Sequence, residues 1–433
     1  MSQASSKLLD SSSIRAWSTV RTWNNLVFLA LDYVVAAIAT GLALWFHFRY
    51  QDWGLSWWWH LPVWGAAVII NGCVTHRIGL MGHEASHNLL VPNRKWNDVL
   101  AELLCFYPVF GSLLQYRAKH LRHHLYPNDP DQDPNLGNGK AERLYAKFPM
   151  PKPSFIYHYY LKFFWPPFVF ANLLDLLDVI TIGSGMSPVP VRDATDEERQ
   201  AGKHSKLVRV RATILGIAYL VALCLILRLV FPFGPTLLWP LVAGLYVVAV
   251  VVWKILPESA FFQGARLSIP IKQAALLRIT CYTLLFSSLA VIRQVTGWDP
   301  TAAFLILWIV PLIYVFPYLM LLREVYQHAN AGQGPLDNSR IIHADPFTRW
   351  AVLGYGNDFH LIHHIYPNIP QYALRGIHRQ LMEESPAYRD GIEETRGILK
   401  PRTGAKETSL LDSLSDTGPM PHRSSLADDP SDA

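Results

Sequence analysis

Six long apolar segments constrain the fold of this chain more than any other feature. The segments are Leu26–Phe48, Leu61–Leu80, Ala212–Phe233, Leu237–Trp253, Leu276–Ile292 and Thr301–Leu322. A helix needs about 20 largely apolar residues to cross the hydrocarbon core of a bilayer. The composition agrees, because 51% of the 433 residues are hydrophobic and only 16% are charged. We therefore expect an all-α integral membrane protein with about six transmembrane helices.

Two further apolar stretches are less uniform. Asp98–Tyr116 is short and contains Glu102 and Pro108, and Phe155–Gly183 is aromatic but interrupted by charged residues and prolines. Such segments are typical of helices that lie at the membrane interface or re-enter the membrane from one side. We expect both to be interfacial or re-entrant.

Both ends of the chain are polar. Residues 1–25 precede the first apolar segment, and residues 384–433 are rich in Ser, Asp, Gly and Pro, which is typical of disordered tails. Residues 26–383 are expected to form one membrane domain between them. The net charge of +5 is modest and does not indicate a nucleic-acid partner.

Eight of the 17 histidines lie in three short motifs. The motifs are HEASH (His83, His87), HLRHH (His120, His123, His124) and HLIHH (His360, His363, His364). Side chains three and four positions apart share a helix face, so each motif is expected to aim its imidazoles at one point. An isolated histidine is usually structural, but this clustering predicts metal binding, since imidazole is a common ligand of iron, zinc and copper.

The number and type of ligands indicate which metals bind. Eight imidazoles exceed the four positions of a tetrahedral zinc site, so two metal ions are implied. The motifs are nearly free of carboxylates, with Glu84 and Asp358 as nearby exceptions. An all-imidazole pair of transition metals favours iron and O2 chemistry on an inert C–H bond over zinc-dependent hydrolysis.

Basic residues predict the orientation in the membrane. They gather before the first apolar segment and in Arg192–Arg211, whereas the expected outside loops hold little beyond Arg49 and Arg293. By the positive-inside rule, the N-terminus is cytoplasmic. An even number of spans separates neighbouring histidine motifs, so the motifs and the C-terminus are expected on the cytoplasmic side, where the motifs would form a cap.

Taken together, the three motifs resemble those of the membrane fatty acid desaturase family, whose relatives include carotenoid ketolases and hydroxylases. The stretches YPNDPDQDP and IYPNIPQYAL, which follow the second and third motifs, are similar to the bacterial acyl-lipid desaturase branch. The resemblance covers about Gly82–Leu381. It implies two iron ions that activate O2 and remove two hydrogens from an acyl chain of a membrane lipid. It also implies a separate electron donor, a ferredoxin or a cytochrome b5-type protein. The sequence contains no HPGG stretch of the kind found in cytochrome b5-like domains.

The same resemblance implies roles for residues outside the motifs. His328, in REVYQHAN, stands where the family supplies a further histidine ligand just after the last span. Asn357 stands where an asparagine contacts iron through a water molecule. Ile362 replaces a glutamate that relatives often have, which leaves the ligands unaffected but removes a hydrogen-bonding group behind them.

Two other functions fit parts of the pattern. A hydroxylase or ketolase of carotenoid or another lipid would use the same ligands. A membrane metal transporter would place ionisable residues near the bilayer midplane, whereas these motifs lie at or beyond one membrane face.

Three smaller features have structural interpretations. DPDQDP (Asp129–Pro134) predicts a rigid turn in which one Asp could orient a ligand imidazole. His76 and Arg77 are expected to be interfacial anchors of the second span. Tyr372–Leu381 is expected to form an interfacial helix on which His378 is solvated.

Overall fold

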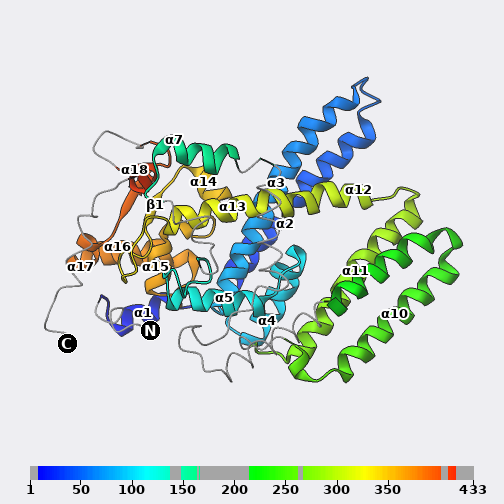
Figure 1. The fold of residues 1–433 in the computed structure, drawn as a ribbon, viewed down its shortest axis with the longest axis horizontal. Helices are drawn as coiled ribbons and strands as arrows, with labels where there is room; N and C mark the ends of the chain where they lie inside the picture. Colours follow the sequence, from blue (N-terminus) through cyan, green and yellow to red (C-terminus); the bar gives the residue numbers. More distant parts are fainter. Residues whose placement is uncertain are drawn as a thin grey trace.

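A computed structural model describes residues 8–136, 148–162, 165, 214–261, 267–400 and 408–415 (Figure 1). Five of the described helices are long and apolar enough to cross a membrane. They are α2 (Thr22–Arg49), η2 with α3 (Trp57–Trp59, His60–Ser86), α10 (Pro235–Ile255), α11 (Ile271–Thr296) and the continuous run of α12, η10 and α13 (Thr301–Phe304, Leu305–Ile309, Val310–His328). The prediction of an all-α integral membrane protein is confirmed.

The remaining predicted segments take other forms. In the segment Ala212–Phe233, which was predicted to span, the structure describes a helix over Ile214–Leu229 followed by η8 (Phe231–Phe233); the residues before Ile214 lie outside the described residues. Phe155–Gly183 is described over η5 (Ile156–Leu161), which continues α7 (Lys152–Phe155); nearly all of the rest of that stretch lies outside the described residues.

The stretch around Asp98–Tyr116 is bent, as expected for a re-entrant segment. Its parts are α4 (Arg94–Ala101), the π-helical turn η3 (Glu102–Phe106), η4 (Tyr107–Val109) and α5 (Leu113–Leu125). The two halves meet at 94°, where Pro108 precedes Phe110 in the left-handed conformation (φ 57°). Counted as one broken span, the pair raises the number of candidate spans to six.

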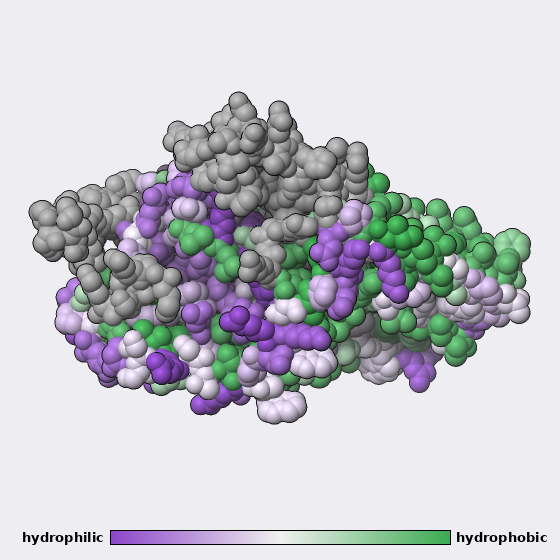
Figure 2. Space-filling view, turned by 90° about the horizontal axis from the view of Figure 1, so that it is seen from below, coloured by the Kyte–Doolittle hydropathy of each residue, from purple (hydrophilic) through white to green (hydrophobic). Residues whose placement is uncertain are grey.

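The surface of the long helices is that of a lipid-facing protein. On α2, Leu31, Val34, Ile38 and Leu42 follow one another at helical spacing and are 50–57% exposed. A stripe of large exposed apolar side chains is costly in water and favourable in lipid. Hydrophobic surface likewise covers the part of the molecule that contains α10 and α11, at the right of Figure 2, whereas hydrophilic surface gathers at the left.

Helix α3 lies at the centre of the bundle, against α2 and α13 (Figure 1). Close approach to α13 depends on Gly72, because a Cβ atom there would lie 2.2 Å from Cβ of Val315. The neighbouring Asn71 donates from Nδ2 to Thr40 Oγ1 (3.0 Å) and to the Leu307 carbonyl (2.7 Å). This buried amide therefore ties α3 to α2 and η10 within the apolar interior.

Small elements form a cap around the end of α13. They are α1 (Ser11–Trp17), β1 (Ile341–His343), α14 (Pro346–Ala351), η11 (Asn357–Phe359), α15 (His360–Ile365), η12 (Gln371–Ala373), α16 (Leu374–Glu384), α17 (Pro386–Gly391), β2 (Glu394–Arg396) and α18 (Leu410–Ser415). Strands β1 and β2 pair in parallel, with Ile341 opposite Glu394 and His343 opposite Arg396. A short 3-10 turn, η9 (Glu258–Ala260), precedes α11 elsewhere in the chain.

One prediction about the cap is wrong. The apolar face of α16, with Leu374, Ile377 and Leu381, is buried by protein, and His378 is 7% exposed rather than solvated. Within residues 384–433, which were predicted to be largely disordered, residues 384–400 and 408–415 are folded, and α18 buries Leu410 in a core shared with α7 and α13. Composition missed this because a few leucines among polar residues suffice to dock a short helix.

Candidate metal centre

Nine histidine side chains converge where α3, α5, α13 and α15 meet. They form two groups, within each of which the candidate ligand atoms all lie within 4.8 Å of one another. Group one is His83, His87, His120, His124 and His363; group two is His123, His328, His360 and His364. The groups adjoin, since the rings of His124 and His364 are 4.3 Å apart. The structure thus brings together all nine histidines that were predicted as ligands.

Each HxxHH motif divides its imidazoles between the groups. The first and last histidines of HLRHH enter group one, and the middle one, His123, enters group two. In HLIHH the assignment is reversed, because only the middle His363 enters group one. Positions i+3 and i+4 lie on opposite sides of position i around a helix, roughly 100° apart, so they can face different centres. The expectation that each motif aims at one point is wrong.

Nitrogen–nitrogen distances in group one are those of ligands around one ion. The Nε2 atom of His120 is 2.8 Å from that of His87, and Nε2 of His124 is 3.0 Å from those of both His120 and His363. A neutral imidazole has only one N–H, so several Nε2 atoms facing one another cannot all be paired by hydrogen bonds. Bonds of about 2.0–2.1 Å to a shared metal place ligand nitrogens roughly 3 Å apart.

Two histidines of group two are oriented by hydrogen bonds from their other ring nitrogen. Nδ1 of His123 is 2.8 Å from Oδ2 of Asp133, and Nδ1 of His328 is 3.0 Å from the carbonyl oxygen of Asn338. A proton on Nδ1 leaves the lone pair on Nε2, which is the arrangement typical of metal-bound histidine. In both rings Nε2 is buried and has no hydrogen-bond partner among the described residues. An Asp of DPDQDP, Asp133, thus contacts a candidate ligand imidazole, and its predicted role in orienting a metal ligand stays a prediction.

Burial favours the neutral form of the imidazoles of the third motif and of His87. The pKa values of His360, His363 and His364 are lowered well below the ordinary value, first by burial and then by neighbouring imidazoles. Burial, with a further contribution from the Arg117 cation, lowers the pKa of His87 to about 3. Neutral imidazole is the form that binds metal, so the nine-histidine site fits a pair of transition-metal ions.

A buried ion pair fixes the first motif against the second. Arg117, three residues before His120, donates from Nη2 to Oδ1 of Asp98 at 2.6 Å. Its Nε also donates to the carbonyl oxygen of Ser86 at 3.0 Å, between the two histidines of HEASH. The guanidinium therefore joins α4, α5 and the end of α3, and composition alone gave no signal for this contact.

The carboxylate of the first motif holds the segment after the third. Oε2 of Glu84 accepts a hydrogen bond from the backbone N–H of Gln371 at 2.9 Å. The Gln371 side chain in turn donates to Oδ1 of Asn25 at the start of α2 (3.2 Å). By accepting this hydrogen bond, Glu84 of the first motif holds the segment that follows the third motif.

Asn357 is buried with its amide engaged by protein. Nδ2 donates to the Gly354 carbonyl oxygen at 2.7 Å, and Oδ1 accepts from Nε2 of Gln327 at 3.3 Å. Contact with a metal through water remains a prediction for this residue. The side chain of Ile362 is fully buried in an apolar cluster, where it packs the third motif onto the cap.

His76 and Arg77 are not interfacial anchors. His76 is 1% exposed and its Nδ1 lies 2.9 Å from the Ala351 carbonyl oxygen. Arg77 donates from Nε to Oδ1 of Asp32 at 2.7 Å, and its guanidinium stacks 4.3 Å over the ring of Tyr355. These contacts tie α2 and α3 to the loop before HLIHH, a role that long-range packing decides and local sequence does not reveal.

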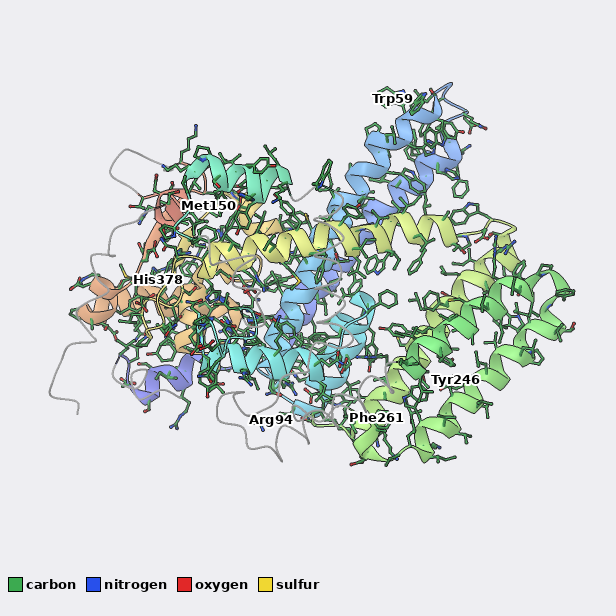
Figure 3. All side chains as sticks on the ribbon, viewed as in Figure 1. Trp59, Arg94, Met150, Tyr246, Phe261 and His378 are labelled. Carbon is green, nitrogen blue, oxygen red and sulfur yellow. The ribbon has the colours of Figure 1, made fainter. Side chains whose placement is uncertain are left out.

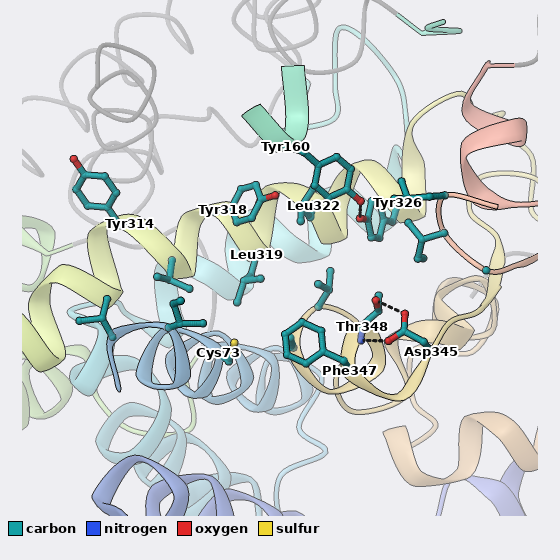
Figure 4. Close-up of a pocket in the computed structure, with 18 of the residues that line it drawn as sticks. Cys73, Tyr160, Tyr314, Tyr318, Leu319, Leu322, Tyr326, Asp345, Phe347 and Thr348 are labelled. Atoms are coloured by element: carbon teal, nitrogen blue, oxygen red, sulfur yellow. Dashed lines mark hydrogen bonds between the residues drawn. The ribbon is translucent and has the colours of Figure 1, made fainter. Parts of the chain in front are cut away.

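An apolar cavity of about 910 Å³ lies on another side of α3 and α13 (Figure 4). Cys73 of α3 and Tyr318 and Leu322 of α13 line the cavity on the side of the membrane spans. Phe347 of α14 lines it on the side of the cap. None of the nine histidines contributes to its lining. The cavity is therefore separate from the metal centre.

The fold and the site define a multi-pass membrane protein with a histidine-rich candidate metal centre. The sequence model of the fatty acid desaturase family matches residues 56–264 and 236–396, and the chain belongs to that family. It is also 32% identical over 130 residues to the dihydrorhizobitoxine desaturase of Bradyrhizobium elkanii, a match that covers 30% of this chain. The chain spans about a third of the length of that relative (33%).

Proposed function

We propose that this protein is an O2-dependent di-iron desaturase that introduces a double bond into a fatty acyl chain of a membrane lipid. The observation that carries the proposal is the convergence of nine imidazoles into two adjoining groups. Membership of the fatty acid desaturase family supports it. So does the similarity to a relative that is itself named a desaturase.

The histidines would hold one iron in each group. Group one would supply its five imidazoles and group two its four, with Asp133 and the Asn338 carbonyl orienting His123 and His328. When bound, the iron pair supplies the activation of O2 and the transfer of electrons. In the net reaction two C–H bonds of the acyl chain break and a C=C bond forms, which gives O2 two electrons and two protons. A ferredoxin or cytochrome b5-type donor supplies two more electrons and solvent supplies two more protons, and the oxygen leaves as two waters.

The protein keeps this chemistry at one membrane face. Trp59 and His83 stand at opposite ends of the span that ends at Ser86, separated by about 36 Å at 1.5 Å per residue. The hydrocarbon core is about 30 Å thick, so the histidines would lie at the far boundary, beside the cap. This geometry favours an enzyme that meets an aqueous donor over a transporter with ligands at the midplane.

We propose that this face is cytoplasmic, as are both chain ends. Reporter tags fused before Met1 and after Ala433 should both be protected from reagents added outside intact cells. A tag reached from outside at either end would contradict the orientation.

The function is tested by expressing the chain in a host that lacks the activity and analysing its lipids by mass spectrometry. The wild type should yield an acyl product lighter by two hydrogens, and His363→Ala should reduce that product below about 1% of wild type while still inserting in the membrane. His158→Ala, outside both groups, is the matched control. A hydroxylated or ketone product would assign a hydroxylase or ketolase instead, and no modified lipid would refute the proposal.

A further inference from the structure

A third set of candidate ligands lies in the cap, apart from the nine histidines. It consists of His343 at the end of β1, His378 on α16 and Glu394 at the start of β2, whose candidate ligand atoms lie within 4.8 Å of one another. Figure 3 labels His378 among the C-terminal elements at the left of the molecule. From this cluster we propose a separate zinc site that braces the cap.

The spacing of the three side chains suits one small ion. Nε2 of His378 lies 3.2 Å from Oε1 of Glu394, and Nε2 of His343 lies 3.7 Å from Oε2 of the same carboxylate. Ligands at about 2.0–2.2 Å from Zn²⁺ in a tetrahedron are separated by roughly 3.3–3.5 Å. Two imidazoles and one carboxylate exclude calcium and magnesium, which take oxygen ligands, and match the three-ligand zinc pattern.

The ring nitrogens are disposed for metal binding. Nδ1 of His378 lies 2.9 Å from the hydroxyl of Tyr388, a contact that leaves Nε2 free to face Glu394. Nε2 of His343 is buried and has no hydrogen-bond partner among the described residues. An orienting partner on the far nitrogen and an unpaired near nitrogen are the features found around metal-bound histidines.

Solvent can complete the coordination. The side chains of His343 and Glu394 are 27% and 22% exposed, so a water molecule can take the fourth position and the ion has a path of entry. Arg396 Nη2 lies 3.8 Å from Oε2 of Glu394, and the Arg396 side chain is 49% exposed.

The position of the site indicates what it does. Its ligands come from three elements, so an ion would join the parallel pair β1–β2 to α16. The ring of Phe359 lies 6.3 Å from that of His343 and 5.2 Å from that of His378, measured between centroids. Phe359 immediately precedes His360 of group two, so the zinc would stabilise the segment behind the HLIHH motif.

Metal analysis of the iron-loaded full-length protein in detergent, equilibrated with zinc and then dialysed, tests this site. The wild type should retain about one zinc per chain in addition to its iron. His343→Ala and Glu394→Gln should each lose that zinc and keep wild-type iron, and Tyr388→Phe should weaken zinc binding about 10–100-fold. Glu383→Gln, an exposed carboxylate on α16, should change neither metal.

The iron content separates this proposal from the proposed function, since zinc can bind whether or not the protein is a desaturase. No zinc in the wild type, or equal zinc in Glu394→Gln and the wild type, would overturn the site. If a variant loses iron as well as zinc, X-ray absorption at the zinc edge of the wild type shows which ligands surround the zinc. Two imidazoles with oxygen ligands at about 2.0–2.2 Å support the site, and a shell of four or five imidazoles refutes it.

Discussion

The Nε2 atoms of His124 and His363 lie 3.0 Å apart, although 239 residues separate them in the chain. The contact joins the second histidine motif to the third and completes group one. Because a bent helix pair carries one residue and the cap carries the other, the metal centre depends on how these parts are held together.

Asp133→Asn should loosen metal binding in group two. The carboxylate contacts Nδ1 of His123, and a neutral amide makes that imidazole a weaker ligand. We expect the affinity for one of two irons to fall about 10–100-fold, measured as iron retained against a chelator. Asp131→Asn, an exposed carboxylate in the same turn, is the control. Equal iron retention in both variants would show that Asp133 does not support a ligand.

Asp98→Asn should destabilise the protein strongly. It leaves the buried Arg117 guanidinium without its anion, which costs about 3–5 kcal/mol of unfolding free energy. Thermal denaturation in detergent measures the loss. The control is Asp52→Asn. Asp52 pairs with Arg49 at the surface, where the side chains of Arg49 and Asp52 are 60% and 58% exposed. That change should leave the melting temperature nearly unaltered, and similar shifts for the two variants would contradict the role of burial.

Gly356→Ala should displace the segment that leads into HLIHH. Gly356 has φ 70°, and a Cβ atom there would lie 2.7 Å from the carbonyl oxygen of Gln371. The left-handed backbone alone costs an alanine about 1–2 kcal/mol, and the clash with backbone adds to it. Gly54→Ala is the control, because Gly54 has φ 65° and a Cβ atom added there would have no other atom within 4 Å. Its loss of stability therefore measures the cost of the left-handed backbone alone. Iron content and melting temperature should fall further for Gly356→Ala; equal effects would remove the clash as a cause.

The sequence allowed the ligands to be predicted but not their arrangement. The spacing of HEASH, HLRHH and HLIHH identifies eight histidines, and resemblance to the family adds His328. Which imidazole enters which group depends on how α5 and α15 are oriented relative to one another, and no local pattern encodes that orientation. For the same reason, long-range contacts such as that of Asp98 with Arg117 appear only in the folded chain.

The membrane spans were predicted more completely than the cap. Hydropathy alone locates spans such as α2 and α10, since lipid-facing helices are apolar over their whole length. Of the predicted span Ala212–Phe233, the described part includes the helix Ile214–Leu229. In the cap, His343 and Glu394 are 51 positions apart and meet only through the parallel pairing of β1 with β2, so periodicity could not reveal them.

The metal content of the purified protein tests the two-group centre most directly. Elemental analysis of protein expressed with iron should find about two irons per chain, in keeping with two separate sets of imidazole ligands. Removal of the iron should abolish turnover, and its return should restore it. Iron-free protein that turns over lipid at the wild-type rate would contradict the centre.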